Sequence, residues 1–272
     1  MSALITNEWL KLAKKKTTGF LFLFLVVATF GVTLLMKLAK VTMTAPQSFA
    51  QLSGMSSFLN LVIVILTASI VAEEFTKGTI KFLLIRPFSR SQILLSKWIT
   101  CILYALFGTF ILWMSSFLAS YLFLKNGSFT TGLTEFGGWN AIEVSLLYGA
   151  TNLLMLVFYS SVTLFISAVI RSQSLAVGLG IGVLFGSSMM NVLLFTLMEK
   201  QNWLRWNPFN LLNIREAIPD FIQMLQGNKA WTSASTNYLV NYWQMGLGLL
   251  LFSTVIYLIT NWLFAKRDVA LS

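Results

Sequence analysis

The sequence predicts an all-α membrane protein with six transmembrane helices, and two observations support that prediction. First, 57% of the 272 residues are hydrophobic and 10% are charged, whereas about 25% of the residues in an ordinary soluble domain are charged. Second, the charged residues cluster and leave six charge-free runs of at least 20 residues, at 17–36, 41–72, 98–124, 144–170, 172–198 and 230–265. About 20 helical residues cross the hydrocarbon layer of a bilayer, so each run is a candidate span. A transmembrane β-barrel would need alternating segments of about ten residues instead.

Residues 1–16 predict a short interfacial helix, which we call the elbow helix. Its apolar residues share one face at helical spacing and its polar residues fall on the other: Leu4, Ile5, Trp9, Leu12 and Ala13 against Asn7, Glu8, Lys11 and Lys14. The first span follows at 17–36. Its 20 residues exceed the apolar core of a typical secretory signal, and no small-residue cleavage pattern follows closely. We therefore expect it to remain a transmembrane helix.

The other spans are predicted near 56–72, 98–124, 147–170, 174–198 and 244–264. The fifth of the six carries Gly178, Gly182 and Gly186, which are spaced four residues apart. Such a face lets another helix approach closely. It fits packing within the chain, a contact with a second subunit, or a flexible gate.

The segment 199–243 between the last two spans is unusually apolar for a loop. Pro208 and Pro219 can each occupy the first turn of a short helix. We expect one or two amphipathic or re-entrant helices at the outer surface, anchored by tryptophans. They would form an outer lid or a simple interfacial anchor, built on Trp206, Pro208, Phe209, Ile214, Ile218 and Phe221.

The distribution of charge predicts the orientation in the membrane. With both termini inside, the inner segments hold twelve basic and four acidic residues, and the longer outer segments hold seven basic and five acidic residues. This bias follows the positive-inside rule for a multi-pass protein of the cell membrane. We attribute the net charge of +10 to orientation and contact with anionic lipid, and we expect no nucleic-acid partner.

The sequence offers little catalytic chemistry. It contains no histidine, and its single cysteine, Cys101, falls within the third charge-free run. Histidine is the usual general base and the commonest metal ligand. The G-x-x-x-x-G-K-[ST] phosphate-binding loop is also missing from the sequence. We expect a non-enzymatic chain that binds no metal or cofactor of its own.

The predicted inner loop, 73–97, has a distinctive pattern. Glu73 and Glu74 open it, and five basic residues follow, interleaved with Phe75, Phe82, Leu83, Leu84 and Phe88. A solvated tether does not need so many apolar residues. The pattern is typical of an amphipathic segment that docks on a soluble partner, with apolar anchors and charges that set the register.

This loop resembles that of the permease subunits of type-2 ABC exporters, which follows the pattern E-x-x-x-G-T-[LI]-x-x-L-L-x-x-P-[IVF]-S-R-x-x-[IL]-x-x-x-K. The matching residues are Glu74, Gly78, Thr79, Ile80, Leu83, Leu84, Pro87, Phe88, Ser89, Arg90, Ile93 and Lys97. Residues 7–12, which precede a lysine cluster, are similar to the elbow helix of the same family. The number of spans extends the resemblance over nearly the whole chain.

The resemblance implies a permease that pairs with cytoplasmic ABC ATPase subunits, on which ATP and Mg would bind, and with a second permease copy or paralogue. It also implies that the inner loop forms a coupling helix seated on the ATPase and that the turn after the fourth span makes a smaller contact. The implied coupling residues are Glu73, Glu74, Phe75, Gly78, Thr79, Lys81, Phe82, Leu84, Arg86, Pro87, Arg90 and Arg171. Local pairing of Glu73 and Glu74 with Lys77 and Lys81 is the alternative.

We therefore expect an ATP-driven exporter of amphipathic or hydrophobic cargo, such as an antimicrobial peptide, a drug or a lipid-like molecule. A secondary transporter is one alternative, although no charged residue lies deep in any predicted span. An intramembrane enzyme has no visible chemistry here. A non-transporting membrane scaffold protein is the remaining alternative.

Overall fold

The computed structural model describes residues 1–51, 53–78, 88–125, 127–170, 172–198, 200–228 and 239–266, without the side chains of 53–55, 195 and 196. These residues form helices and connecting loops, with no strand element among them. The helices are α1 Ser2–Ala13, α2 Lys16–Leu38, α3 Ala45–Ala50, α4 Ser53–Thr76, α6 Arg90–Phe123, η1 Thr134–Phe136, α7 Ala141–Val169, α8 Gln173–Met198, η2 Asn202–Trp206, α9 Pro208–Leu211, η3 Ile214–Ala217, α10 Ile218–Leu225 and α11 Tyr242–Lys266.

The prediction of six membrane-spanning helices is confirmed. Within the described residues, 6 helices are long and apolar enough to cross a bilayer, with mean hydropathy between 1.8 and 2.5. They are α2, α4, α6, α7, α8 and α11. The chain is thus an all-α, multi-pass membrane protein.

Two helix ends differ from the predicted bounds and shorten the inner loop. α4 runs on to Thr76, and α6 begins at Arg90 rather than at 98. The prediction of a loop over 73–97 is therefore wrong at both ends, and the connection covers residues 77–89. Ser89 caps α6 through a reciprocal pair of hydrogen bonds with Gln92, which allows the helix to start before the charge-free run does.

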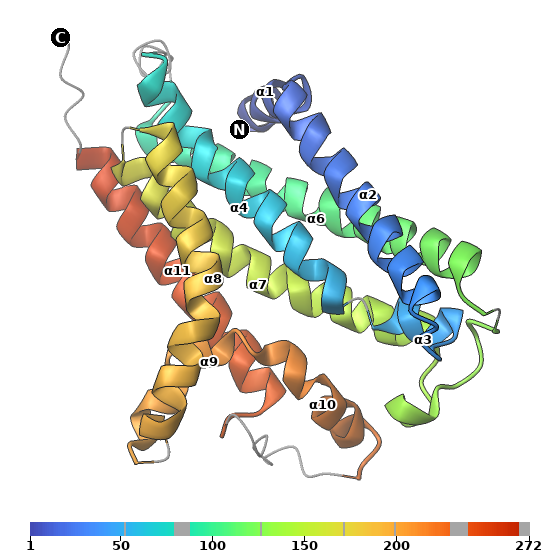
Figure 1. The fold of residues 1–272 in the computed structure, drawn as a ribbon. Helices are drawn as coiled ribbons and strands as arrows, with labels where there is room; N and C mark the ends of the chain where they lie inside the picture. The colour runs from blue at the N-terminus through green and yellow to red at the C-terminus, as the bar shows by residue number, and fades with distance from the viewer. Residues whose placement is uncertain are drawn as a thin grey trace.

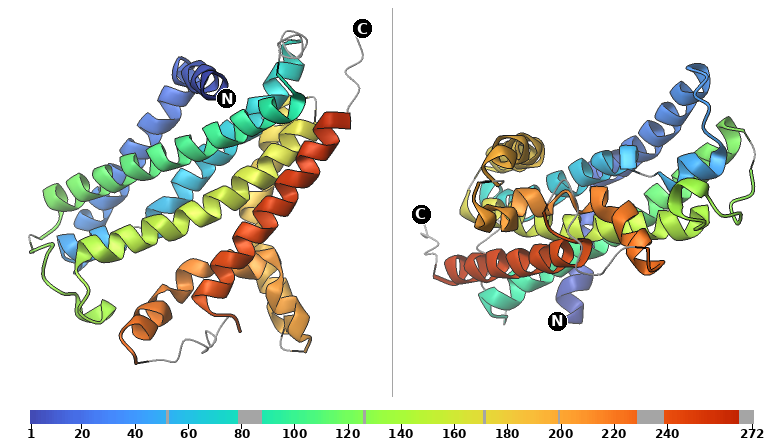
Figure 2. Two further views of the ribbon diagram at one scale, coloured as in Figure 1. Left: turned by 180° about the vertical axis from the view of Figure 1, so that it is seen from behind. Right: turned by 90° about the horizontal axis from the view of Figure 1, so that it is seen from below.

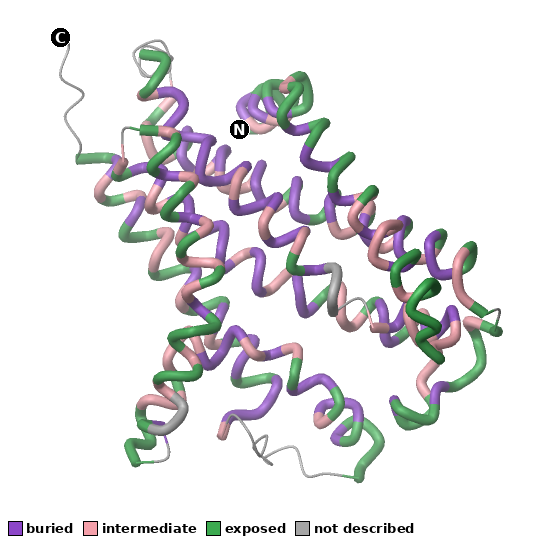
Figure 3. Tube along the Cα trace, in the orientation of Figure 1, coloured by how far each residue is buried: buried purple, intermediate pink, exposed green. Residues whose placement is uncertain are grey.

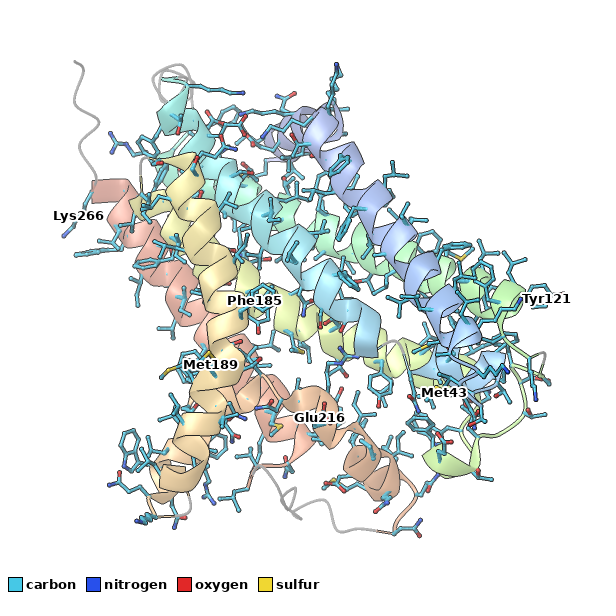
Figure 4. All side chains as sticks on the ribbon, viewed as in Figure 1. Met43, Tyr121, Phe185, Met189, Glu216 and Lys266 are labelled. Atoms are coloured by element: carbon cyan, nitrogen blue, oxygen red, sulfur yellow. The ribbon has the colours of Figure 1, made fainter. Side chains whose placement is uncertain are left out.

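The helices lie close together at the end where α1 begins and α11 ends, and they spread apart toward the opposite end (Figures 1 and 2). We call the first the lysine-rich end and the second the far end. Lys266 of α11 and Glu216 of η3, both labelled in Figure 4, mark these two ends. α7 lies centrally and packs against α4, α6, α8 and α11.

Two groups of buried apolar side chains hold the bundle. The first joins α1, α2, α4 and α6 and includes Leu25, Leu59, Ile63 and Leu94. The second joins α3, α7, α10 and α11 and includes Phe49, Ile218 and Met245. Figure 3 shows the burial concentrated along α4 and α7, which occupy the middle of the molecule.

The outer faces of several helices are apolar and exposed. On α8, Phe185 and Met189 are 63% and 71% exposed, and Figure 4 labels both. In the most apolar stretch of α8, 11% of the residues are buried inside the protein. Exposure on this scale would be costly in water but suits contact with lipid tails, because the hydrocarbon layer solvates apolar side chains.

The glycine face of α8 does not pack within the chain. Among the described residues, no atom lies within 4 Å of a methyl group built on Gly178, Gly182 or Gly186. Packing against the bundle uses Gly180 instead, whose added methyl would lie 3.1 Å from Val64 and 3.2 Å from Thr163. The prediction of intramolecular packing through the three glycines is therefore wrong, whereas a subunit contact stays a prediction.

The predicted short helices of the outer segment are present. Pro208 opens α9, which Asn207 caps, and Pro219 lies in the first turn of α10. Ile214, Ile218 and Phe221 are buried, and Phe221 stacks on Tyr242 of α11 with ring centroids 4.2 Å apart. Of the remaining predicted lid residues, Pro208 and Phe209 are half-buried and Trp206 is 40% exposed. The segment is thus ordered against the bundle, while its action as a lid stays a prediction.

Candidate functional site

A cluster of seven charged side chains lies at the lysine-rich end and joins three helices. We call it the ion cluster. Glu8 and Lys11 belong to α1, and Lys15 lies between α1 and α2. Glu73 and Glu74 belong to the last turn of α4, Lys77 follows that helix, and Lys97 belongs to α6. Three carboxylates thus meet four ammonium groups. It adjoins the 77–89 connection that the sequence marks as functional.

Lys97 is the centre of the cluster. Its side chain is fully buried, and its ammonium donates to Glu8 Oε2 at 2.8 Å, to Glu74 Oε1 at 3.0 Å and to the Ile70 carbonyl at 3.3 Å. An ammonium group has three donor hydrogens, so all three have acceptors. Two carboxylates from different helices compensate the cost of removing this charge from water.

The two glutamates at the end of α4 reach outward to lysines of the N-terminal region. Glu74 accepts from Lys11 as well as from Lys97, and Glu73 pairs with Lys15. Glu73 also pairs with Lys77, one turn along the same helix, at 2.7 Å. This bond raises the pKa of the Lys77 ammonium. The local-pairing alternative is thus confirmed for Lys77, whereas Lys81 lies outside the described residues.

The short helix α1 is held against α6 by aromatic contacts too. Trp9 stacks on Tyr104 with ring centroids 4.3 Å apart, and the Tyr104 hydroxyl donates to the Trp9 carbonyl at 3.0 Å. Leu4, Glu8 and Leu12 share the buried face of α1. The prediction that placed Glu8 on the polar outer face is therefore wrong: its carboxylate points inward because Lys97 lies there.

The end of α4 is joined to α7 and α8 as well. The backbone N–H groups of Val71 and Ala72 both donate to the Ser167 hydroxyl of α7, at 3.1 Å and 2.9 Å. The Thr76 hydroxyl accepts from the backbone N–H of Gln173, the first residue of α8, at 3.2 Å. Any displacement of the end of α4 therefore acts on α1, α6, α7 and α8 together.

The described ends of the 77–89 connection are shaped by local chemistry. Gly78 has φ +67°, in the left-handed region that ends helices and favours glycine. At the other end, Phe88 packs on the first core group, and Arg90 donates to the Ala265 carbonyl of α11 at 3.3 Å. Both ends of the connection are thus fixed to the bundle.

The structure places the predicted coupling residues in two groups. Glu73 and Glu74 are buried, Phe75 and Arg90 are half-buried, and Gly78 is exposed. The others fall outside the described residues: Thr79, Lys81, Phe82, Leu84, Arg86, Pro87 and Arg171. Both glutamates are buried and contact lysines of the same chain, and their role in coupling stays a prediction.

Sequence reasoning missed Lys11, Lys15 and Lys97 as partners of Glu73 and Glu74, and it missed Glu8 as a partner of Lys97. One signal was available, because Glu8 lies four residues from both Leu4 and Leu12 and therefore on their helical face. A carboxylate on an apolar stripe requires a cationic partner. Lys97 is fully buried, but it is the eighth of the 34 residues of α6 and precedes the predicted span 98–124, so it does not contradict the expectation that no charged residue lies deep in a span.

Comparison with known proteins places the chain among membrane proteins. It is 28% identical over 265 residues to "Uncharacterized membrane protein YdbK" of Bacillus subtilis (strain 168), covering 96% of this chain and 99% of that protein. It is 30% identical over 217 residues to "Uncharacterized protein YhcI" of the same organism, covering 77% of this chain and 64% of that protein. A protein-family profile matches residues 20–270. The chain therefore belongs to the family described as "Protein of unknown function (DUF2705)".

Proposed function

We propose that this chain is the membrane-spanning permease subunit of an ATP-driven ABC exporter, with ATP and Mg bound by a separate cytoplasmic ATPase. The observation that carries the proposal is the 77–89 connection, whose sequence has the pattern of a coupling segment and whose base is fixed by the ion cluster. The lysine-rich end would face the cytoplasm in the cell membrane, with both termini inside. A second permease copy or paralogue would complete the exporter.

The ion cluster supports this function mechanically. A segment that transmits movement from an ATPase must be attached rigidly to the transmembrane helices. Here Glu73 and Glu74 at the end of α4 are bound to the N-terminal region by Lys11 and Lys15, and Glu74 is bound to α6 by Lys97. Movement of the connection would therefore turn several helices as one body instead of bending α4 alone. The cargo would be amphipathic or hydrophobic, because the spans are apolar over most of their length.

A secondary transporter explains these features less well. Lys97 is the eighth residue of the 34-residue α6, so the buried charges lie near one membrane surface. Ion-coupled carriers place such groups near the middle of the bilayer, where the coupling ion must cross. A membrane scaffold would not need the apolar and basic pattern of the connection.

Purification of the tagged chain from its native membranes tests the proposal. We expect a Mg-dependent ATPase to co-purify, and we expect Phe82→Asp with Leu84→Asp to remove that activity without changing the amount of inserted chain. Trp203→Asp is the matched control, because Trp203 is a 70% exposed apolar residue at the far end. Wild-type chain that carries no ATPase activity would contradict the proposal.

A further inference from the structure

Two cavities adjoin between the short helices of the outer segment and the middle of the spans, and neither belongs to the proposed coupling site. The first, the polar pocket, has a volume of about 250 Å³ and is lined by Ser57, Tyr159, Ser188, Asn213, Arg215 and Glu216, among others. The second, the apolar groove, measures about 490 Å³ and is lined by Phe158, Val162, Gly182, Val183, Gly186 and Ile256, among others. Ser187, Phe209 and Leu212 line both cavities. The two cavities thus share a wall and lie side by side, one polar and one apolar.

Arg215 gives the polar pocket a positive charge. Its guanidinium donates to the Ser56 hydroxyl and lies over the Tyr148 ring, 5.4 Å from the ring centroid. Burial lowers the pKa of Arg215 from its usual value, although the nearby Tyr148 and Glu216 act in the opposite direction. Arginine stays protonated in proteins, and its planar donors match the oxygen pairs of carboxylates and phosphates.

Local structure fixes Arg215 in this position. It belongs to η3, in which the neighbouring Ile214 and Ala217 are buried against the bundle. Glu216, the next residue, is exposed. The polar pocket is therefore lined by the short helices of the outer segment on one side and by α4, α7 and α8 on the other.

The apolar groove has the dimensions of a ligand site. Its volume falls within the range of roughly 300–1,000 Å³ that is usual for such sites. Added methyl groups at Gly182 and Gly186 would meet no neighbouring atom within 4 Å among the described residues. The space of the groove beside these two glycines is therefore unfilled by side chains. An aliphatic chain fits an apolar wall of this kind.

We propose that the two cavities bind one amphipathic anion, with its carboxylate or phosphate at Arg215 and its aliphatic chain in the apolar groove. The charge of Arg215 selects the head, and the shared lining places the apolar groove directly beside the polar pocket. A fatty acid and an anionic phospholipid both have this chemistry. The inference concerns binding alone and is independent of the exporter proposal.

Native mass spectrometry of the purified full chain in a neutral detergent tests it, with oleate, phosphatidylglycerol and phosphatidylcholine as probes. We expect oleate or phosphatidylglycerol to bind at least about tenfold more tightly than phosphatidylcholine, because a charge-assisted hydrogen bond replaces a contact with a zwitterionic head. The tighter of the two probes identifies the head group. Arg215→Gln should abolish the preference, and Arg205→Gln, in the same segment but outside both cavities, should retain it.

Two further variants test the pocket and the groove separately. Glu216→Gln should strengthen binding of the anionic probe by removing a nearby negative charge. Gly182→Leu should weaken binding of the long-chain probe by filling the groove, while binding of butyrate is retained. Equal binding of all three lipids, or an unchanged preference in a folded Arg215→Gln variant, would overturn the inference. If Arg215→Gln does not fold, unchanged affinities in both other variants would overturn it.

Discussion

Lys97 places a full positive charge inside the protein, and its environment explains how that charge is tolerated. Two carboxylates and one backbone carbonyl accept its three hydrogens, so no donor is left without an acceptor. A buried ion pair of this kind adds little net stability compared with an apolar contact, because desolvation offsets much of the attraction. The ion pairs instead fix the position of α1 relative to α4 and α6, because Glu8, Glu74 and Lys97 meet only when the three helices are aligned in this way.

Breaking this pair on one side should be costly. We predict that Glu8→Gln or Lys97→Met lowers the free energy of unfolding by about 3–5 kcal/mol, because the first removes one of the two carboxylates that pair with the buried Lys97 and the second removes the ammonium that pairs with the buried Glu8. The double variant should recover part of the loss. Lys77→Ala, which removes the i,i+4 pair between the exposed Lys77 and Glu73, should cost much less and serves as the control. Thermal unfolding in detergent measures the series, and strictly additive losses would contradict the coupling of Glu8 to Lys97.

The sequence could not show this network in full. Glu8 and Lys97 are 89 residues apart, and their contact depends on the angle at which α1 crosses α6, which no local pattern encodes. The sequence predicted only that Lys97 marks the start of a span, because it directly precedes the charge-free run 98–124. The sequence singled out Glu73 and Glu74 as contacts for a partner at the surface, whereas both side chains are buried.

At the scale of elements, the short helices of the outer segment were predictable. Each has proline in its first turn, and its apolar residues recur at helical spacing, which are strong local signals. The early start of α6 was not predictable from the charge-free run. Such runs mark the part of a helix that crosses hydrocarbon, whereas Ser89 and Gln92 decide where the helix begins.

The same segment allows a test of the predicted lid. Ile218→Asp with Phe221→Asp should release α10 from α7 and α11, since each buried apolar side chain contributes roughly 1.5–3 kcal/mol. We expect faster hydrogen exchange across 209–225 and impaired export of cargo. Gln223→Asp, on the exposed face of α10, is the matched control. Wild-type export by the double variant would rule out the lid, and unprotected amides in the wild-type chain would contradict the ordered segment.

The glycine face of α8 shows what a motif alone does not decide. Small residues four apart allow close helix packing, but the structure packs α8 through Gly180 and leaves the other face open to lipid or a partner. The spacing marks a face of small residues but does not say what packs on it. Its neighbour depends on the rotation of α8 about its axis, which the apolar pattern of a membrane helix specifies poorly.

For the whole molecule, composition and charge distribution were sufficient to predict the number of spans. The placement of both ends of the chain at one end of the bundle follows from an even number of crossings (Figure 1). The orientation relative to the cell was inferred from the basic residues alone. The spreading of the helices toward the far end arises from side-chain packing between distant segments.

Orientation can be tested by labelling single-cysteine variants in intact cells. With Cys101 replaced by serine, we predict that a cysteine at position 227 reacts with a membrane-impermeant thiol reagent, while one at position 86 reacts only after the cells are opened. A cysteine at position 126 should behave like the one at 227. Labelling of position 86 from outside would contradict both the orientation and the six-span topology.

The contact between the 77–89 connection and an ATPase is the central claim, and site-specific photocrosslinking tests it most directly. A photoreactive amino acid would replace Phe82 in one variant and Trp203, at the far end, in the other. We predict that position 82 crosslinks in native membranes to a chain that binds ATP and that position 203 does not. Absence of an ATP-binding partner at position 82, with the variant correctly inserted, would contradict the account.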